Sequence, residues 1–214
     1  MSVEIIGVSE KDAPLTLIGK IAGTSTDKSE SGDPVKRAKS CIRRGHMSVA
    51  EFVTVTFSVT GSRAMTHQLV RHRLASFCQL SQRYCKVDTD DMDWFVTPPS
   101  IDECDTATPS GSSAKTAYEA AMASAALQYK NLLAAGVKPE DARYVLPNAC
   151  MTTIRVSMNL RELQSFYRLR SDRHAQWEIR DVAEGVKEQL TEYTKDSTEW
   201  QELIGLLLTH EDQK

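Results

Sequence analysis

The stretch RHRLASFCQLSQRY, residues 71–84, has the most pronounced chemical character of any segment in this 214-residue chain. It combines arginine, histidine, hydroxyl and amide side chains, and no Asp or Glu occurs between residues 61 and 84. Arginine presents a planar fork of donors that fits phosphate, while hydroxyls and amides can satisfy the remaining oxygen lone pairs. The stretch therefore predicts a binding site for an anionic, phosphate-bearing ligand.

An alternative interpretation of the same residues is a basic surface helix. Arg71 and Arg73 would lie near the end of a predicted helix over 62–74, where the helix dipole favours positive charge. That interpretation explains these two charges but not Ser81, Arg83 or Tyr84, which follow at fixed offsets after seven intervening residues. The spacing favours a binding site.

Composition limits the class of ligand. The chain is 41% hydrophobic and 26% charged, which is typical of a globular protein, and we expect one domain over residues 1–214. Its formal net charge is −3, whereas proteins that bind nucleic acid usually carry a basic face. A local basic segment on a mildly acidic chain predicts a small phosphorylated ligand and no nucleic-acid partner.

The cysteines and the N-terminus indicate a reducing compartment. The five cysteines form no C-x-x-C pair, so neither a disulfide framework nor a metal site is indicated. For each of them a small buried apolar side chain is a better interpretation than a nucleophile. The N-terminus has no signal-peptide pattern, and no segment has the length of a membrane helix. We therefore expect a cytoplasmic protein without a membrane partner.

Apolar periodicity predicts both strands and helices. Residues 51–60 and 151–158 alternate apolar and polar side chains as half-buried strands do, and residues 3–8 form a short apolar run. An alanine-rich helix is predicted over 114–135, ending at a glycine, and another begins at Asn159, whose spacing to Glu162 is that of a capping box. Asp172 is predicted to cap a further helix.

Four separated blocks of the chain together resemble the flavin-dependent thymidylate synthase family. The first two are GHMSVAEF at 45–52 and the RHR segment at 71–84 with its Ser81 and Arg83. The others are DARYVLP at 141–147 and NLRELQSFYRLRSDRHAQWEI at 159–179. One short pattern is weak evidence, but four in the family's order form a specific resemblance.

The resemblance implies a fold, a reaction and an assembly. The fold is α+β, a small, largely antiparallel sheet flanked by long helices in a single domain. The reaction is the reductive methylation of dUMP to dTMP, with methylenetetrahydrofolate as carbon donor, tightly bound FAD as hydride carrier and NADPH as reductant. The assembly is a homotetramer with active sites shared between subunits.

Site residues are also implied by the resemblance, position by position. The flavin-contacting positions correspond to His46, Ser48, Arg71, His72, Arg73, Gln79, Asn159, Arg161, Ser165 and His174. The dUMP-binding positions correspond to Gln68, Arg71, Gln79, Ser81, Arg83, Arg143 and Arg170. Arg170 corresponds to the catalytic arginine, which activates the pyrimidine by favouring its N3-ionised, electron-rich form.

The chain departs from the commonest family pattern at three places. Cys78-Gln79 stands where many members have Asn-Glu, Ser165 stands where Asn is common, and Phe52 replaces a second histidine. Gln79 can still donate and accept hydrogen bonds. His174 and Glu178 have i,i+4 spacing, so a simple helix-surface pair is an alternative to a flavin contact for His174.

A second hypothesis is a non-catalytic nucleotide- or RNA-binding protein that uses the basic 71–84 segment. It predicts salt-sensitive binding of oligonucleotides. It leaves Arg143, Arg170 and the His-Ala-Gln sequence at 174–176 without a role.

Overall fold

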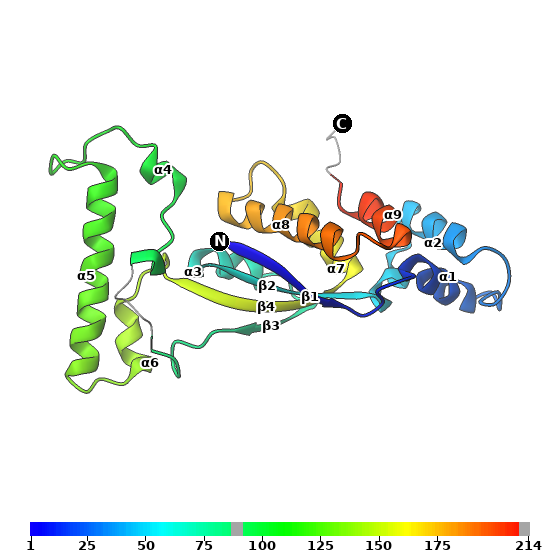
Figure 1. Ribbon diagram of the computed structural model, residues 1–214, viewed down its shortest axis with the longest axis horizontal. Helices are drawn as coiled ribbons and strands as arrows, with labels where there is room; N and C mark the ends of the chain where they lie inside the picture. Colours follow the sequence, from blue (N-terminus) through cyan, green and yellow to red (C-terminus); the bar gives the residue numbers. More distant parts are fainter. Residues whose placement is uncertain (87–91, 210–214) are drawn as a thin grey trace. The chain divides into compact units, whose positions relative to one another are not determined.

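The computed structural model describes residues 1–86 and 92–209. In this part of the chain one antiparallel sheet is formed by β1 (Ser2–Val8), β2 (Thr54–Ser62), β4 (Met151–Asn159) and β3 (Ala75–Gln79), in that spatial order (Figure 1). The α+β fold class with a small antiparallel sheet is confirmed.

Helices make up most of the remaining regular structure. The α-helices are α1 (Pro14–Thr24), α2 (Pro34–Arg43), α3 (Arg63–Leu69), α4 (Pro99–Asp102), α5 (Ala114–Ala134), α6 (Pro139–Ala142), α7 (Leu160–Arg170), α8 (Trp177–Tyr193) and α9 (Thr198–Leu207). Short 3-10 helices are η1 (Met47–Phe52), η2 (Met92–Trp94) and η3 (Arg143–Val145). Among these described helices, none is both long enough and apolar enough to cross a membrane.

The contacts within the chain define two compact units. The first comprises Met1–Val59, Gln68–Cys78 and Ile154–Lys214, and the second comprises Thr60–His67 and Gln79–Thr153. The boundary between the two units falls within strands β2 and β4. It does not fall in a linker between elements. A single domain over 1–214 stays a prediction.

Two pairs of polar side chains show the register of the central strands β2 and β4. Thr56 Oγ1 donates to Ser157 Oγ at 3.1 Å in the first unit, and the hydroxyls of Thr60 and Thr153 lie 3.0 Å apart in the second. Later residues of β2 therefore pair with earlier residues of β4, as antiparallel pairing requires. The alternate residues of β2 point into the core, where Val55, Phe57 and Val59 are fully buried.

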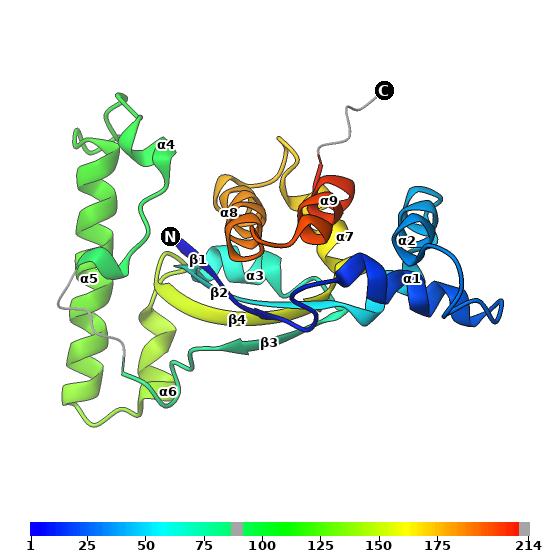
Figure 2. The same cartoon turned by 45° about the vertical axis from the view of Figure 1, so that its right-hand side comes forward.

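Apolar helix faces cover this sheet in the first unit. Figures 1 and 2 place α7, α8 and α9 on the same side of the strands. One face of α8 is buried at Ile179, Val182, Val186 and Leu190, as expected for an amphipathic helix packed on a core. Trp200 of α9 is fully buried, and its indole nitrogen donates to the Glu10 carbonyl oxygen at 2.9 Å.

Local sequence signals set several helix ends. Asn159 Oδ1 accepts a hydrogen bond from the Glu162 backbone nitrogen at 2.9 Å, which confirms it as the N-cap of α7. Gly45 and Gly136 follow α2 and α5 with φ of 76° and 87°, a conformation that favours glycine. Helix α5 matches the predicted alanine-rich helix closely.

Three local predictions were wrong. Residues 47–52 form η1, so β2 starts at Thr54, where it pairs with Ser9. Helix α3 ends at Leu69 rather than Leu74, because the Arg71 and His72 backbone nitrogens bond to carbonyls three residues back and tighten the chain into a turn.

The predicted cap at Asp172 is the third error. Gln176 caps α8 instead, accepting from the Glu178 and Ile179 backbone nitrogens, and Asp172 Oδ1 accepts from the His174 backbone nitrogen at 2.8 Å. His174 therefore lies in the loop before α8 and does not share a helix face with Glu178. The i,i+4 interpretation of this pair is excluded.

Two helical glycines give a matched test of packing between α1 and α2. A Cβ on Gly19 would lie 1.8 Å from the Pro34 carbonyl oxygen, whereas a Cβ on Gly205 of α9 would meet nothing within 4 Å. Gly19→Ala is expected to lower the free energy of unfolding by about 1–3 kcal/mol through overpacking. Gly205→Ala is expected to raise it by about 0.5–1 kcal/mol, since alanine is the better helix former.

Urea unfolding of both variants measures these changes. Equal midpoints for Gly19→Ala and the unsubstituted protein would contradict the tight α1–α2 contact.

Candidate active site

A buried histidine lies at the turn between α3 and β3. The His72 side chain is only 4% exposed, and its Nδ1 lies 3.0 Å from Glu162 Oε1 of α7. Its other ring nitrogen, Nε2, accepts a hydrogen bond from Arg170 Nε at 3.1 Å. Carboxylate, imidazole and guanidinium thus form a continuous hydrogen-bonded chain, which we call the Glu162–His72–Arg170 chain.

The environment favours the neutral form of this imidazole. Burial lowers the pKa of His72 below its ordinary value of 6.5, and the positive charge of Arg170 lowers it further. The hydrogen bond to Glu162 acts in the opposite direction and raises the pKa, but burial is the larger effect. His72 is therefore neutral at physiological pH.

Arg170 is fixed at the C-terminal end of α7. Besides its bond to His72, its Nη2 donates to the Gln68 carbonyl oxygen at 3.0 Å. The Gln68 side chain donates to Gln176 Oε1 at 3.4 Å. Partial burial lowers the pKa of Arg170, although an arginine stays protonated at neutral pH. The structure therefore brings together three predicted site residues, Gln68, His72 and Arg170.

A depression of about 470 Å³ lies beside α7 in the first unit. Its lining consists of Gly45, Met47, Arg161, Gln164, Ser165, Arg168 and Leu169. Two predicted flavin positions, Arg161 and Ser165, belong to this lining. Arg161 Nη1 also donates to Glu51 Oε1 at 2.6 Å.

The other predicted flavin positions of this unit have different surroundings. Arg71 and Arg73 flank His72 with exposed side chains, and His46 and Ser48 are exposed at the start of η1. The Asn159 side chain is engaged as the cap of α7. His174 Nε2 accepts from Arg173 Nε at 3.3 Å in the loop before α8.

The predicted nucleotide residues of the second unit lie near Glu140. Arg83 Nε is 3.7 Å from Glu140 Oε2, and Arg143 Nε donates to the Glu140 carbonyl oxygen at 3.0 Å. Ser81 Oγ accepts from the Arg83 backbone nitrogen at 3.2 Å, which fixes the local turn. Two arginines held at one short helix can receive an anionic group.

Gln79 is held by hydroxyls of the same unit. Its Nε2 donates to Thr66 Oγ1 at 3.2 Å and to Thr152 Oγ1 at 3.4 Å. The two hydroxyls, one on α3 and one on β4, thereby orient the amide nitrogen. A carboxylate could not make these two donations, so the glutamine suits this position in this chain.

Sequence reasoning missed three residues of these regions. It gave Glu162 only a capping role, yet its carboxylate contacts His72. It gave no role to Arg63 and Gln82, whose Nε and Nε2 atoms are buried without a hydrogen-bond partner in the described part of the chain. Burial and the charge of Arg143 lower the pKa of Arg63. Because the Glu162–His72 contact joins distant parts of the sequence, no local pattern identifies it.

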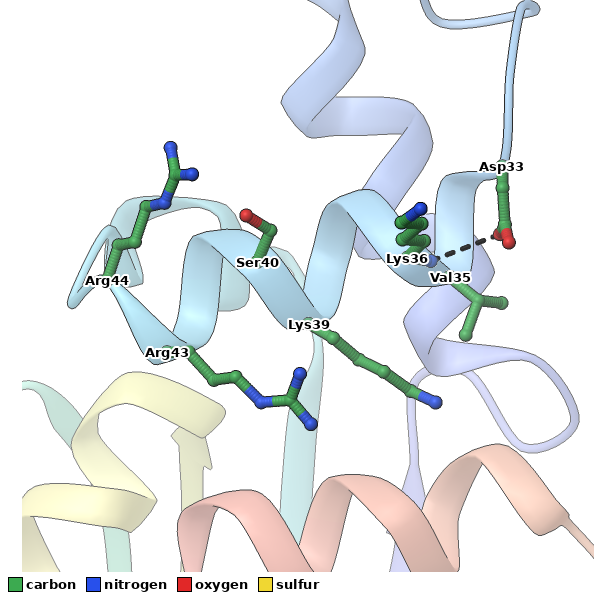
Figure 3. Close-up of a pocket in the computed structure, with 7 residues that line it drawn as sticks. All are labelled: Asp33, Val35, Lys36, Lys39, Ser40, Arg43 and Arg44. Atoms are coloured by element: carbon green, nitrogen blue, oxygen red, sulfur yellow. Dashed lines mark hydrogen bonds between the residues drawn. The ribbon is translucent and has the colours of Figure 1, made fainter.

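A second depression, of about 500 Å³, is lined by residues of α2 and its flanks. Although it contains lysines and arginines, Figure 3 shows Arg44 and Ser40 pointing to one side of the helix and Arg43 and Lys39 to the other. Lys39 is paired with Glu202 of α9. These charges do not converge, so we place the candidate site at the Glu162–His72–Arg170 chain.

Within residues 1–86 and 92–209, no cluster of His, Cys, Asp and Glu is suited to hold a metal.

The first unit thus combines a buried, hydrogen-bonded histidine with arginines of α7, a set of side chains suited to an anionic, phosphate-bearing ligand. The family model described as thymidylate synthase complementing protein matches residues 8–194. The chain is 40% identical over 174 residues to the flavin-dependent thymidylate synthase of Pyrococcus furiosus, covering 80% of this chain. It is 44% identical over 148 residues to that of Pyrococcus abyssi, covering 68% of this chain. The chain belongs to the flavin-dependent thymidylate synthase family.

The aligned parts span 68% of the Pyrococcus furiosus protein and 58% of the Pyrococcus abyssi protein. A solved structure of the flavin-dependent thymidylate synthase from Helicobacter pylori, complexed with FAD and dUMP, has the same fold. Its TM-score is 0.72 at 23% identity, covering 98% of this chain and 100% of that chain.

The sequence predicted a small buried apolar side chain for each of the five cysteines. That prediction is wrong for Cys78, Cys85 and Cys104, which are exposed, whereas Cys150 is buried. Cys150 is fully buried with Phe95, Met122 and Ala126, and burial raises the pKa of its thiol to about 11. Because only the thiolate reacts, iodoacetamide at pH 8 is expected to leave Cys150 unmodified in the native protein. The exposed Cys78 serves as the internal control, since its thiol is accessible to the reagent.

Mass spectrometry of tryptic peptides measures both sites. Alkylation of Cys150 as fast as Cys78 would contradict the inert, buried thiol.

Proposed function

We propose that the protein catalyses the reductive methylation of dUMP to dTMP. The observation that carries the proposal is the fixed arrangement of Gln68, His72 and Arg170 at positions that match the family's site. Family membership supports catalysis over the non-catalytic nucleotide- or RNA-binding alternative, which no observation favours.

The residues of the first unit suit a flavin cofactor. The depression beside α7 combines the cations Arg161 and Arg168 with the apolar side chains of Met47 and Leu169. Cations match the diphosphate of FAD, and apolar side chains match its ring system. The family resemblance assigns the following residues to FAD, and we propose the same roles here: His46, Ser48, Arg71, His72, Arg73, Gln79, Asn159, Arg161, Ser165 and His174.

The residues of the second unit suit the nucleotide phosphate. Arg83 and Arg143 are held close to Glu140, and Ser81 fixes the turn between them and β3. Phosphate oxygens accept strongly from arginine, so this pair is the proposed anchor for dUMP. The family resemblance also assigns Gln68, Arg71, Gln79 and Arg170 to the nucleotide.

The residues of this chain contribute to the reaction by orienting the ligands and by placing a positive charge beside the pyrimidine. When bound, FAD supplies the hydride, while methylenetetrahydrofolate provides the carbon and NADPH the reducing equivalents. Arg170 places a fixed positive charge beside the uracil carbonyls and stabilises the ring after loss of the N3 proton. Its bonds to His72 and Gln68 keep it in place before substrate arrives. We further propose a cytoplasmic homotetramer with active sites shared between subunits.

The spectrum of the purified protein tests the cofactor assignment. Flavin absorbance near 450 nm is a property of FAD rather than of the chain, so its presence after purification or after incubation with FAD is the expected result. dUMP and methylenetetrahydrofolate are expected to convert to dTMP only when NADPH is present. A protein that binds no FAD and forms no dTMP would refute the proposal.

Arg170→Ala separates the catalytic role from cofactor binding. The variant is expected to keep FAD while dTMP formation falls by about a hundredfold or more, because a charge aimed at the transition state is lost. Arg44→Ala, at the exposed C-terminal end of α2, removes an equal charge from outside the site and is the matched control. Flavin absorbance and dTMP formation are measured for both. Full activity of Arg170→Ala would disprove its assigned role.

A further inference from the structure

Glu162 is a buried carboxylate to which the family resemblance gives no role. Only 9% of the residue is exposed, and its backbone nitrogen is used by the α7 cap. Its carboxylate lies instead against His72 Nδ1, at 3.0 Å. A buried carboxylate is costly unless it is paired, so this contact requires a reason.

The hydrogen-bond chain fixes the position of the imidazole proton. Arg170 Nε carries a hydrogen and can only donate, so His72 Nε2 must be the acceptor. In the neutral ring the proton then resides on Nδ1, where it donates to Glu162 Oε1. With the proton on Nε2 instead, two N–H groups would face each other and the bond to Arg170 would be lost.

Packing keeps the ring in this orientation. The His72 ring meets the fully buried Phe166 ring edge to face, with centroids 5.2 Å apart. Phe166 lies on α7 between Glu162 and Arg170, so one helix supplies the acceptor, the ring contact and the donor. The spacing of four residues between each of these side chains places all three on one face.

We propose that Glu162 is a positioning residue for the thymidylate synthase reaction, which holds His72 in the Nδ1–H tautomer and through it orients Arg170 toward the pyrimidine. This inference rests on the proposed function. Glu162 touches neither substrate nor cofactor in this assignment, and it acts through the imidazole.

The proposal has a defined pH dependence. Glu162 and Arg170 are the charged groups that act on His72, and the neutral ring is the form that holds Arg170. Protonation adds a hydrogen at Nε2, opposite Arg170 Nε, so activity is present above the pKa of His72 and is lost as pH falls through it. Burial lowers the pKa of His72 below 6.5. In a plot of kcat against pH, we therefore expect the fall on the acidic side, called the acidic limb, to lie below pH 6.5.

Two substitutions distinguish the role of Glu162 as a hydrogen-bond acceptor from the role of its negative charge. Glu162→Gln keeps an oxygen acceptor for Nδ1–H but removes the negative charge that raises the pKa of His72. Its kcat is expected to fall only a few-fold, and its acidic limb is expected to shift to lower pH. Glu162→Leu removes acceptor and charge, so kcat is expected to fall by about tenfold or more at pH 8.

The experiment measures kcat, the KM for dUMP and the pH profile of the FAD-loaded enzyme. Glu184→Gln is the matched control, because Glu184 of α8 also accepts from a buried ring group, the Tyr167 hydroxyl at 3.1 Å, but lies outside the assigned site. It is expected to change neither kcat nor the acidic limb. Thermal unfolding and flavin absorbance of each variant identify any that fails to fold or to bind FAD.

The outcomes are distinct. A shift of the acidic limb in Glu162→Gln, with kcat rather than KM reduced in Glu162→Leu, supports the proposal. An unshifted limb in Glu162→Gln overturns it, even if Glu162→Leu does not fold. Equal loss of kcat in both variants also overturns it, since charge alone would then matter.

Failure of the proposed function has a different signature. In that case the unsubstituted protein forms no dTMP, and ¹⁵N chemical shifts of labelled histidine still report the tautomer of His72. A loss of the Nδ1–H signature in Glu162→Leu supports the positioning of His72, and an unchanged tautomer overturns it.

Discussion

The hydrogen bonds between Glu162, His72 and Arg170 are the constraint on which the candidate site depends. They join the turn after α3 to α7, two segments that are far apart in the sequence. Burial strengthens the bond between Glu162 and His72 and makes its loss costly, because an unpaired carboxylate there has little access to water. The turn after α3, in which the Arg71 and His72 backbone nitrogens donate to carbonyls three residues back, places His72 against α7.

The same hydrogen bonds distinguish Arg170 from Arg71 and Arg73. Arg170 is immobilised by His72 and the Gln68 carbonyl oxygen, as a group that stabilises charge during a reaction needs to be. Arg71 and Arg73 flank the same histidine but are exposed, which suits groups that meet a ligand and close on it. The RHR tripeptide thus contains one buried ring, which is bonded to Arg170, and two exposed cations.

Much of the fold could be predicted from local patterns. Period-two alternation identified β2 and β4, and cap residues identified the start of α7 and the end of α5. The errors concern where helices and strands begin and end. Helix α3 ends at Leu69, where the chain tightens into a turn, and Gln176 rather than Asp172 caps α8 because the Asp172 carboxylate accepts from the His174 backbone nitrogen.

The sequence by itself determined the family, the residue types of the site and the alternation that builds the sheet, because these depend on short spacings and fixed motifs. Only the tertiary structure decided the partners of those residues. Glu162 appeared in the sequence as a capping residue, and its contact with His72 spans ninety residues of chain. Hydrogen bonds between distant segments depend on how strands and helices pack, and no local period in the sequence encodes that packing.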